Sequence, residues 1–166
     1  MKGTDRFLIA VVVVAVALAG AAIAVMLLRP KPSFRQEATP EAAVHNYLLA
    51  LQQEDYERAF LYLSPTIEGY PRSPQAFEEA VRDYNWQFRL GDTSTALEVL
   101  SARIVGERAT VTVQETSFYQ GGLFDSSQRT STFEMRLRRD LPKSAWLLVE
   151  GDSYWAWCWN DQKGCG

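Results

Sequence analysis

The chain has 166 residues, of which 47% are hydrophobic, and a formal net charge of −3 at pH 7. Residues 7–28 hold much of that hydrophobicity, with Gly20 the only exception, whereas the 138 residues that follow are about 41% hydrophobic. That second part is long enough for one hydrophobic core, its charge of −4 argues against a nucleic-acid-binding surface, and its 19 aromatic residues exclude disorder for most of its length.

Residues 7–28 are predicted to form a transmembrane helix. Their 22 uncharged residues rise about 33 Å as a helix, enough to cross a hydrocarbon core of about 30 Å. A cleavable signal peptide is the alternative, because Ala17-Leu18-Ala19 and Ala19-Gly20-Ala21 resemble its cleavage sites. The apolar run continues to Leu28, beyond the usual length of a signal-peptide hydrophobic region, so a retained anchor is favoured.

The location of the remaining chain depends on the orientation of this helix. Basic residues lie on both sides of the span, so their count does not decide the orientation. A tail as short as residues 1–6 is typical of an uncleaved signal anchor, which makes that tail cytoplasmic and places the C-terminal domain outside the cytoplasm at the cell membrane. Cys158 and Cys165 agree with this, because a disulfide across their short loop would hold the C-terminus in an oxidising compartment. Two reduced, inert thiols are the alternative.

Residues 29–38 contain two prolines and no apolar periodicity, which predicts a linker off the membrane. Three helices should follow it. Thr39 and Ser73 each precede a proline, the pattern of an N-cap and first helical position, and Asp55 is placed to cap the helix between them. The buried stripes predicted for the three helices are Val44, Leu48 and Leu51; Tyr56, Ala59, Phe60 and Leu63; and Phe77, Ala80, Val81, Tyr84 and Phe88.

After Gly91 the hydrophobic period changes from 3.6 to 2, which predicts strands. Together the predicted elements make one α+β domain over residues 39–166, with three helices packed on a four-stranded antiparallel sheet. The first two strands are residues 96–105 and 108–119, joined by a turn at Gly106-Glu107. The third strand directs Phe133, Met135 and Leu137 inward, and the last runs from Trp146 towards Trp159.

The order of these elements resembles the nuclear transport factor 2-like (ketosteroid-isomerase-like, cystatin-like) superfamily. The segment TPEAAVHNYLLALQQEDYERAFLYLSP carries the likeness, with a Thr-Pro-Glu-capped helix and then the step Asp55-Tyr56-Glu57-Arg58-Ala59 into a second helix. The turn before Trp146 is similar to the closing hairpin of that superfamily. The resemblance implies a curved sheet wrapped around the helices as a cone, often with a pocket at its open end, and it includes membrane-anchored bacterial members.

An isomerase-type site in this superfamily pairs a tyrosine with one or two carboxylic acids inside the cone. The helix cap explains Asp55, and the alternation of the last strand places Glu150 and Asp152 towards solvent. We therefore expect no catalytic site. The residues considered for one are the acids Asp55, Glu150 and Asp152 and the hydroxyl donors Tyr47, Tyr62 and Tyr154.

No metal site and no cofactor are expected either. His45 is the only histidine, and it lies beside the buried stripe of its helix, where a surface position explains it. The glycines at 121–122 belong to a hairpin loop and form no phosphate-binding or dinucleotide-binding motif.

Aromatic residues are concentrated near the C-terminus. Trp155, Trp157 and Trp159 alternate, which places them on one face of the last predicted strand. One interpretation is core packing, favoured for Trp155; the other is a recognition surface formed by Trp157 and Trp159 at the rim of the sheet. We take these three residues and Tyr47 as candidates for ligand or partner binding. A second candidate patch surrounds Phe118, Tyr119, Leu123 and Phe124.

The resulting hypothesis is a single-pass, membrane-anchored, extracytoplasmic binding or interaction module without catalysis. Its expected partners are the membrane, through residues 7–28, and a protein or second copy bound through the sheet, or a small apolar ligand. A structural component of an envelope or secretion assembly is the alternative, and a small-molecule isomerase or hydrolase that uses the cone is the least favoured.

Overall fold

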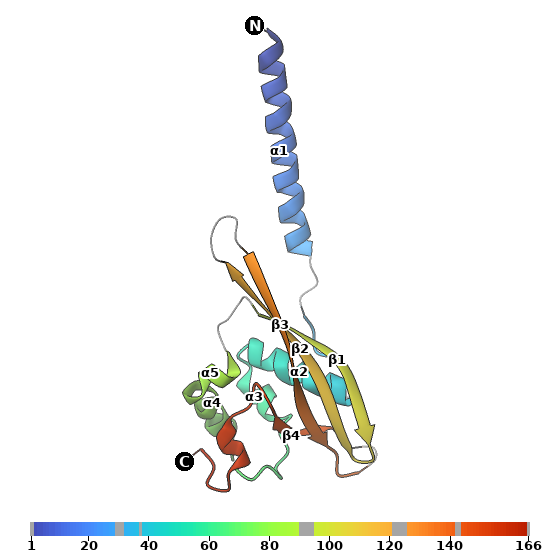
Figure 1. Ribbon diagram of the computed structural model, residues 1–166, viewed down its shortest axis with the longest axis vertical. Helices are drawn as coiled ribbons and strands as arrows, with labels where there is room; N and C mark the ends of the chain where they lie inside the picture. The colour runs from blue at the N-terminus through green and yellow to red at the C-terminus, as the bar shows by residue number, and fades with distance from the viewer. Residues whose placement is uncertain are drawn as a thin grey trace. The chain divides into compact units, whose positions relative to one another are not determined.

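The computed structural model describes residues 2–28, 32–36, 38–89, 95–120, 126–141 and 144–165 (Figure 1). The chain forms two compact units, Met1–Pro32 and Ser33–Gly166. Helix α1, Lys2–Leu28, makes up the first unit and spans the stretch for which a helix is predicted. Among the described residues, no helix is at once long enough and apolar enough to cross a membrane.

The helices of the second unit begin where their caps predict. The side chain of Thr39 accepts a hydrogen bond from the Ala42 amide ahead of α2, Pro40–Gln52. Asp55 caps α3, Tyr56–Phe60, and Ser73 caps α4, Pro74–Asp83, in the same way. The third predicted helix does not run unbroken to Phe88. Tyr84 leaves the helical conformation, so the chain continues as the separate short helix α5, Asn85–Phe88.

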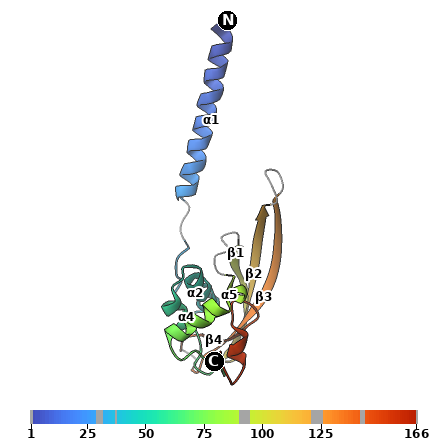
Figure 2. The same ribbon diagram turned by 90° about the vertical axis from the view of Figure 1, so that its left-hand side faces the viewer.

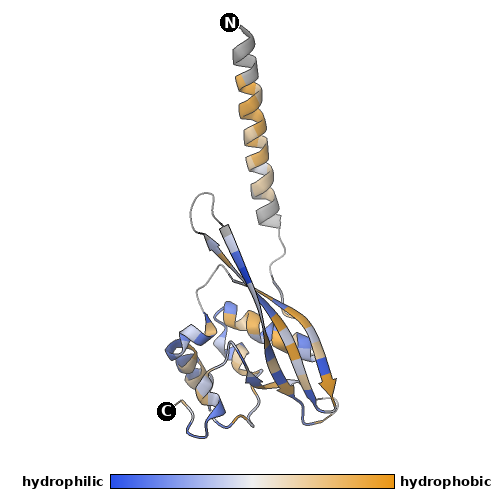
Figure 3. Cartoon of the chain, in the orientation of Figure 1, coloured by the Kyte–Doolittle hydropathy of each residue, from blue (hydrophilic) through white to orange (hydrophobic). Residues whose placement is uncertain are grey.

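The predicted four-stranded antiparallel sheet is confirmed. Its strands are β1, Thr95–Val105; β2, Arg108–Gln120; β3, Ser126–Arg138; and β4, Leu147–Gly151, in the spatial order β1-β2-β3-β4. Figure 2 shows α2 and α4 on one side of this curved sheet, and Figure 3 shows hydrophobic and hydrophilic residues alternating along the strands. The sheet therefore presents one apolar face to the helices and one polar face outward.

The core lies between the helices and the inner face of the sheet. Val113 and Phe133 face each other across β2 and β3, and Tyr47 and Leu51 of α2 belong to the same buried cluster. The bulk of the core is aliphatic and aromatic, as the periodicity of the sequence predicts. The inward-facing strand residues that are buried include Ala109, Val111, Val113, Phe133, Met135, Leu137 and Leu148.

The prediction of a last strand reaching Trp159 is wrong. β4 ends at Gly151, because the Asp152 side chain accepts a hydrogen bond from the Glu134 amide and its own amide donates to the Glu134 carbonyl. The chain then turns through Tyr154, whose φ of 55° lies in the left-handed region, and enters the 3-10 helix η1, Trp157–Asn160. The three tryptophans consequently leave the sheet and diverge, instead of sharing one strand face.

Residues 33–36 lie against α2. The buried Asn46 side chain pairs with the backbone of Arg35, accepting from its amide at 2.7 Å and donating to its carbonyl at 2.9 Å. The Arg58 guanidinium lies 4.0 Å from the centre of the Phe34 ring, a cation–π contact. Part of the stretch predicted as a linker is therefore held by the folded domain.

Candidate functional site

A buried carboxylate lies on the inner face of the sheet. Glu115 follows Ala109, Val111 and Val113 on the inward side of β2, and only 2% of its surface is exposed. Its two oxygens are both engaged: Oε2 forms an ion pair with Arg89, and Oε1 accepts a hydrogen bond from the Tyr154 hydroxyl at 3.1 Å. A buried charge is stable only with such partners, so Arg89 and Tyr154 explain how Glu115 is accommodated.

The two partners of Glu115 are held by an uncommon backbone. Arg89 ends α5 with a φ of 47°, and Tyr154 has a φ of 55°, both in the region that favours glycine. The Arg89 amide donates to the Asn85 carbonyl at 2.8 Å, and the Tyr154 amide donates to the Gln87 carbonyl at 3.2 Å. The strain at Arg89 is therefore offset by a hydrogen bond that closes α5, and the strain at Tyr154 by one that joins the turn after β4 to α5.

Tyr47 joins the network from helix α2. It is fully buried in α2, and its hydroxyl donates to the Tyr154 carbonyl at 2.8 Å. Burial raises the pKa of Tyr47 well above its ordinary value, because the ionised form would lose its hydration. The hydrogen bonds thus connect α2, the turn at Tyr154 and strand β2, with the ion pair to Arg89 at the end.

The acids predicted for an enzyme lie elsewhere. Asp55 caps α3, while Glu150 and Asp152 are half-exposed and face Arg136, at 2.6 and 3.9 Å. The hydrogen bond and charge of Glu150 raise the pKa of Arg136. The structure brings Tyr47 and Tyr154 together but joins them to Glu115, which the sequence reasoning missed. The alternation along β2 was the available signal, because it places residue 115 inward.

The three tryptophans have different surroundings. Trp155 and Trp159 are buried and their ring centres are 4.9 Å apart in an edge-to-face pair. Trp159 also stacks on Phe77, with ring centres 5.4 Å apart, so it fills the space between η1 and α4. Trp157 points outward, with 54% of its surface exposed.

Trp157 belongs to a surface that also includes α5. Its ring meets Tyr84 edge to face at a centre distance of 6.1 Å, and its amide donates to the Gln87 side chain at 3.1 Å. Trp86, next to Gln87, is 68% exposed. We call Tyr84, Trp86 and Trp157 the aromatic surface. Trp86 was not singled out in the sequence analysis, although the helical period of the predicted stripe from Phe77 to Phe88 places residue 86 on the opposite, outward face.

The second predicted patch is only partly described. Phe118 and Tyr119 near the end of β2 are exposed. Leu123 and Phe124 lie outside the described residues. His45 is half-exposed, with Nε2 at 3.1 Å from the Ser33 carbonyl oxygen. In the part of the chain that the structure describes, no three His, Cys, Asp or Glu side chains are grouped to hold a metal ion.

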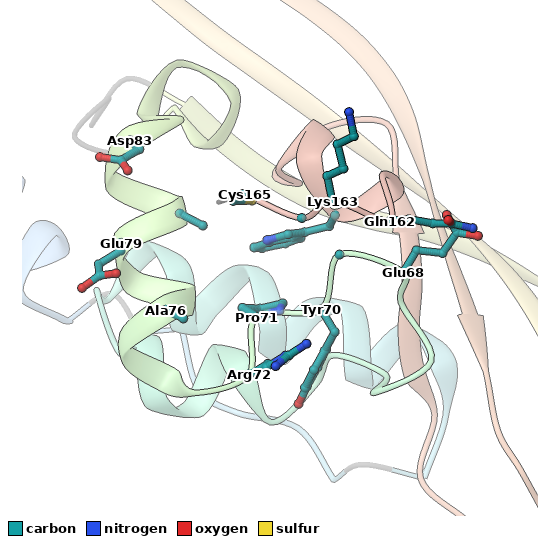
Figure 4. Close-up of a pocket in the computed structure, with 14 residues that line it drawn as sticks. Glu68, Tyr70, Pro71, Arg72, Ala76, Glu79, Asp83, Gln162, Lys163 and Cys165 are labelled. Atoms are coloured by element: carbon teal, nitrogen blue, oxygen red, sulfur yellow. The ribbon is translucent and has the colours of Figure 1, made fainter.

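A cavity of about 410 Å³ lies outside the sheet, between the loop 68–72, helix α4 and the C-terminal residues 159–165 (Figure 4). The predicted disulfide between Cys158 and Cys165 is present and closes the C-terminal segment into a loop. The Gly69 amide donates to the Trp159 carbonyl at 2.9 Å, which joins the loop to that segment. A side chain at Gly69 would meet the backbone of Cys158 and Trp159, so glycine is needed for this close approach.

Comparison with known proteins finds likeness only at the level of structure. No protein-family model matches the sequence, and no curated protein matches it. Among solved structures, a nuclear transport factor 2-like protein with a cystatin-like fold from Novosphingobium aromaticivorans is 17% identical, over 81% of this chain and 86% of that chain, with a TM-score of 0.45.

Two further structures are similar to the same degree. A protein of unknown function with a cystatin-like fold from Nostoc punctiforme is 14% identical, over 69% of this chain and 90% of that chain, with a TM-score of 0.42. A SEC-C motif-containing protein from Rhodopseudomonas palustris is 18% identical, over 72% and 81%, with a TM-score of 0.46. The chain thus has structural neighbours that are nuclear transport factor 2-like and cystatin-fold proteins, and these neighbours assign it no activity, ligand or partner.

Proposed function

We propose that this protein is a single-pass, membrane-anchored, extracytoplasmic interaction module without catalytic activity, and that it binds a partner protein through the aromatic surface. The anchor is proposed from the sequence, since residues 7–28 carry no charge and are long enough to span a bilayer. Among the described residues, the structure has no helix that is both long and apolar enough to cross a membrane, and the anchor is tested directly below.

The observation that carries the proposed interaction is the exposure of two tryptophans, Trp86 on α5 and Trp157, which contacts the residues on either side of Trp86. Trp157 is fixed by its contacts with Tyr84 and Gln87, and Trp86 is on the same short helix as Gln87. A large rigid side chain that remains exposed loses little conformational entropy when a partner covers it, and tryptophan is enriched among residues that dominate binding energy. The aromatic surface therefore has the character of a protein-binding site.

The absence of catalysis is proposed because both oxygens of Glu115 already have partners. A general base needs a free oxygen near the proton it removes, whereas both oxygens of Glu115 already have partners. Tyr47 likewise directs its hydroxyl to the Tyr154 carbonyl. These groups link elements of the domain to one another, which supports a structural role for the network.

The anchor is tested by fractionation of bacterial cells that express the full chain. We expect the protein to sediment with membranes and to resist alkaline extraction, and we expect Val13→Asp with Val14→Asp to release it, because each central charge costs about 3 kcal/mol in a bilayer. Extraction of the unaltered chain would contradict the anchor. An impermeant maleimide tests the location: intact cells should be labelled at Cys158 and Cys165 only after reduction.

The interaction is tested with a photo-crosslinking amino acid at position 157 in living cells. We expect a discrete adduct with another protein, which disappears when Trp86→Ala is added. The same amino acid at Leu141, an apolar position after β3 that is more exposed than Trp157, is the control and should give none. Equal crosslinking at both positions would overturn the aromatic surface. A covalent dimer would identify a second copy as the partner, and an adduct with a stable envelope complex would favour the assembly alternative.

A small-molecule enzyme is a second candidate, because the buried Glu115 carboxylate and the Tyr154 hydroxyl are hydrogen-bonded at the inner face of the sheet. This candidate predicts that Glu115→Gln abolishes turnover of a substrate while Asp55→Asn, which alters a helix cap and an exposed ion pair with Arg58, leaves the turnover number unchanged. A search for isomerase or hydrolase activity with the unaltered chain and Glu115→Gln side by side decides it.

A further inference from the structure

Strand β1 forms one edge of the sheet (Figure 1). It is 11 residues long, and none of its residues is buried. Among the strands that the structure describes, only β2 pairs with it, so the amide and carbonyl groups on its other side have no neighbouring strand. A long, open edge strand is a template for pairing with another chain.

Apolar side chains are exposed along this edge strand. Leu100, Ile104 and Val105 are 48%, 52% and 70% exposed. Lysine and proline commonly protect an edge strand from pairing, and β1 contains neither of them. Its charged residues are one acid, Glu98, and one base, Arg103. The strand thus exposes apolar side chains together with an unpaired backbone edge.

A bulge at Leu100 shifts the alternation of side chains in the middle of β1. Val99 is opposite the buried Val113 of β2. Ser101 is opposite Thr112, the next residue of β2, so Leu100 is an extra residue in β1. Before the bulge the odd-numbered residues lie on the inner face of the sheet, and after it the even-numbered residues do. The two halves of the strand therefore have opposite alternation.

A second copy of β1 fits this pattern when the two strands run antiparallel about a two-fold axis. Residues that are directly opposite in such a pair must lie on the same face of the sheet. Because the alternation shifts at Leu100, a register exists in which each residue before the bulge is opposite a residue after the bulge on the same face. The pairs in this register include Glu98 with Arg103 on the outer face, and Leu97 with Ile104 and Val99 with Ala102 on the inner face, and each pair occurs twice.

The charges of β1 favour this register. Within the chain, Glu98 is opposite Gln114 and Arg103 is opposite Thr110, and both of these neighbours are uncharged. Neither Glu98 nor Arg103 forms an ion pair in the part of the chain that the structure describes. In the two-fold pair each Glu98 is opposite the Arg103 of the other copy, which stabilises a cross-strand pair. A shift by two residues, the smallest that keeps the faces matched, places both charges opposite uncharged residues.

We propose that the free edge of β1 binds β1 of a second copy of this chain, antiparallel and about a two-fold axis, in the register that places Glu98 opposite Arg103. The two four-stranded sheets then become one continuous sheet, and the same residues of both copies form the interface. The aromatic surface lies around α5 and η1 and contributes nothing to this pairing. The dimer and the proposed partner protein therefore stand or fall independently.

The register is tested by cysteine crosslinking of the purified full chain in detergent, in which Cys158 and Cys165 are already bonded to each other. Glu98→Cys with Arg103→Cys places thiols of the two copies directly opposite, and oxidation should give a covalent dimer. Each single variant should give none, because its two thiols would be five residues, or about 17 Å, apart along the pair. Glu98→Cys with Val105→Cys is the register control. Its thiols share a face but are two residues out of register, too far apart for a disulfide, so it should also give none.

The charge pairing is tested by sedimentation equilibrium of the full chain in detergent. Glu98→Arg sets arginines of the two copies opposite each other, and we expect the dimer to dissociate about tenfold more readily. Arg103→Glu should weaken it to a similar degree. Glu98→Arg with Arg103→Glu restores opposite charges and should return the dissociation constant to within about twofold of the unaltered chain. Glu79→Arg, at an exposed acid of α4, is the control and should leave the dimer unchanged.

Three outcomes would overturn the proposal. The full chain could sediment as a monomer at every concentration, the register control could crosslink as well as Glu98→Cys with Arg103→Cys, or the double charge reversal could associate as weakly as the single reversals. Crosslinking from position 157 is measured separately in Glu98→Arg, where we expect its adduct to persist. A failed dimer with that adduct intact, or a dimer without the adduct, shows which of the two proposals is wrong.

Discussion

Tyr154 donates its hydroxyl hydrogen to Glu115 across 39 positions of sequence, at a distance of 3.1 Å. The carbonyl of the same tyrosine accepts from Tyr47, so one turn connects β2 to α2. Arg89 adds an ion pair to the other oxygen of the buried Glu115 carboxylate. The network therefore holds together the sheet, the first helix of the domain and the turn after β4.

Removing Arg89 or removing the charge of Glu115 should cost different amounts of stability, although the two side chains form one ion pair. Arg89→Ala leaves the buried Glu115 carboxylate without its cation, and we expect a loss of about 2–3 kcal/mol in the free energy of unfolding. Glu115→Gln should cost less, about 1–2 kcal/mol, because Arg89 is half-exposed and regains water while the amide still accepts from Tyr154. Urea unfolding measures both. An equal or reversed order would contradict the burial of Glu115.

Tyr47→Phe should weaken the fold in a pH-dependent way. At pH 7 the Tyr154 carbonyl loses its buried donor, which costs about 1–2 kcal/mol. Because burial raises the pKa of Tyr47, the unfolded chain releases this proton first, and the unaltered protein should lose stability as the pH rises above about 10. That decline should be shallower in Tyr47→Phe. The exposed Tyr119→Phe is the control at pH 7 and should match the unaltered chain.

Gly69→Ala should destabilise the domain more than a glycine change elsewhere. The new Cβ would meet the Cys158 carbonyl oxygen and lie 2.9 Å from Trp159 Cα, both backbone atoms that cannot turn aside. We expect a loss of about 3 kcal/mol, as for overpacking at a tight site. In Gly106→Ala no atom lies within 4 Å of the new Cβ. The only cost is the strain of an alanine at a φ of 60°, which lowers the free energy of unfolding by about 1 kcal/mol. Thermal unfolding of both variants gives the comparison.

Asn46→Ala should release residues 33–36 from α2. Both backbone groups of Arg35 lose their partner, and we expect a cost of about 1–2 kcal/mol. The more sensitive readout is trypsin, which should cleave after Arg35 faster in this variant. Asn85→Ala, at an exposed position in α5, serves as the control. Unchanged cleavage at Arg35 would show that Asn46 does not hold the segment.

Reduction of the disulfide should destabilise the C-terminal segment. The bond joins residues seven apart, and for so short a loop chain entropy predicts about 2–3 kcal/mol. The melting temperature should fall when reductant is added. Cys158→Ser with Cys165→Ser should melt at the lower temperature and should not respond to reductant. A response of that double variant would indicate an effect unrelated to the bond.

The sequence by itself determined the local features of this protein. Thr39, Asp55 and Ser73 cap their helices, because a side-chain oxygen beside a free amide needs nothing from the rest of the chain. The alternation of apolar residues likewise predicted the antiparallel meander and its inward face. The disulfide between Cys158 and Cys165, which the sequence analysis expected in an oxidising compartment with two reduced thiols as the alternative, is present.

Only the tertiary structure decided what surrounds the aromatic and charged residues. Period-2 alternation predicted one face for Trp155, Trp157 and Trp159, but β4 ends where Asp152 binds the backbone of Glu134, and the turn that follows buries Trp159 and exposes Trp157. Glu115 could be placed inward from the pattern of β2, yet its partner Arg89 lies far away in the sequence. Arg89 pairs with Glu115 from a left-handed backbone conformation, which the sequence pattern does not predict. A repeat of two or 3.6 residues records only local backbone geometry, whereas these contacts depend on where distant segments meet.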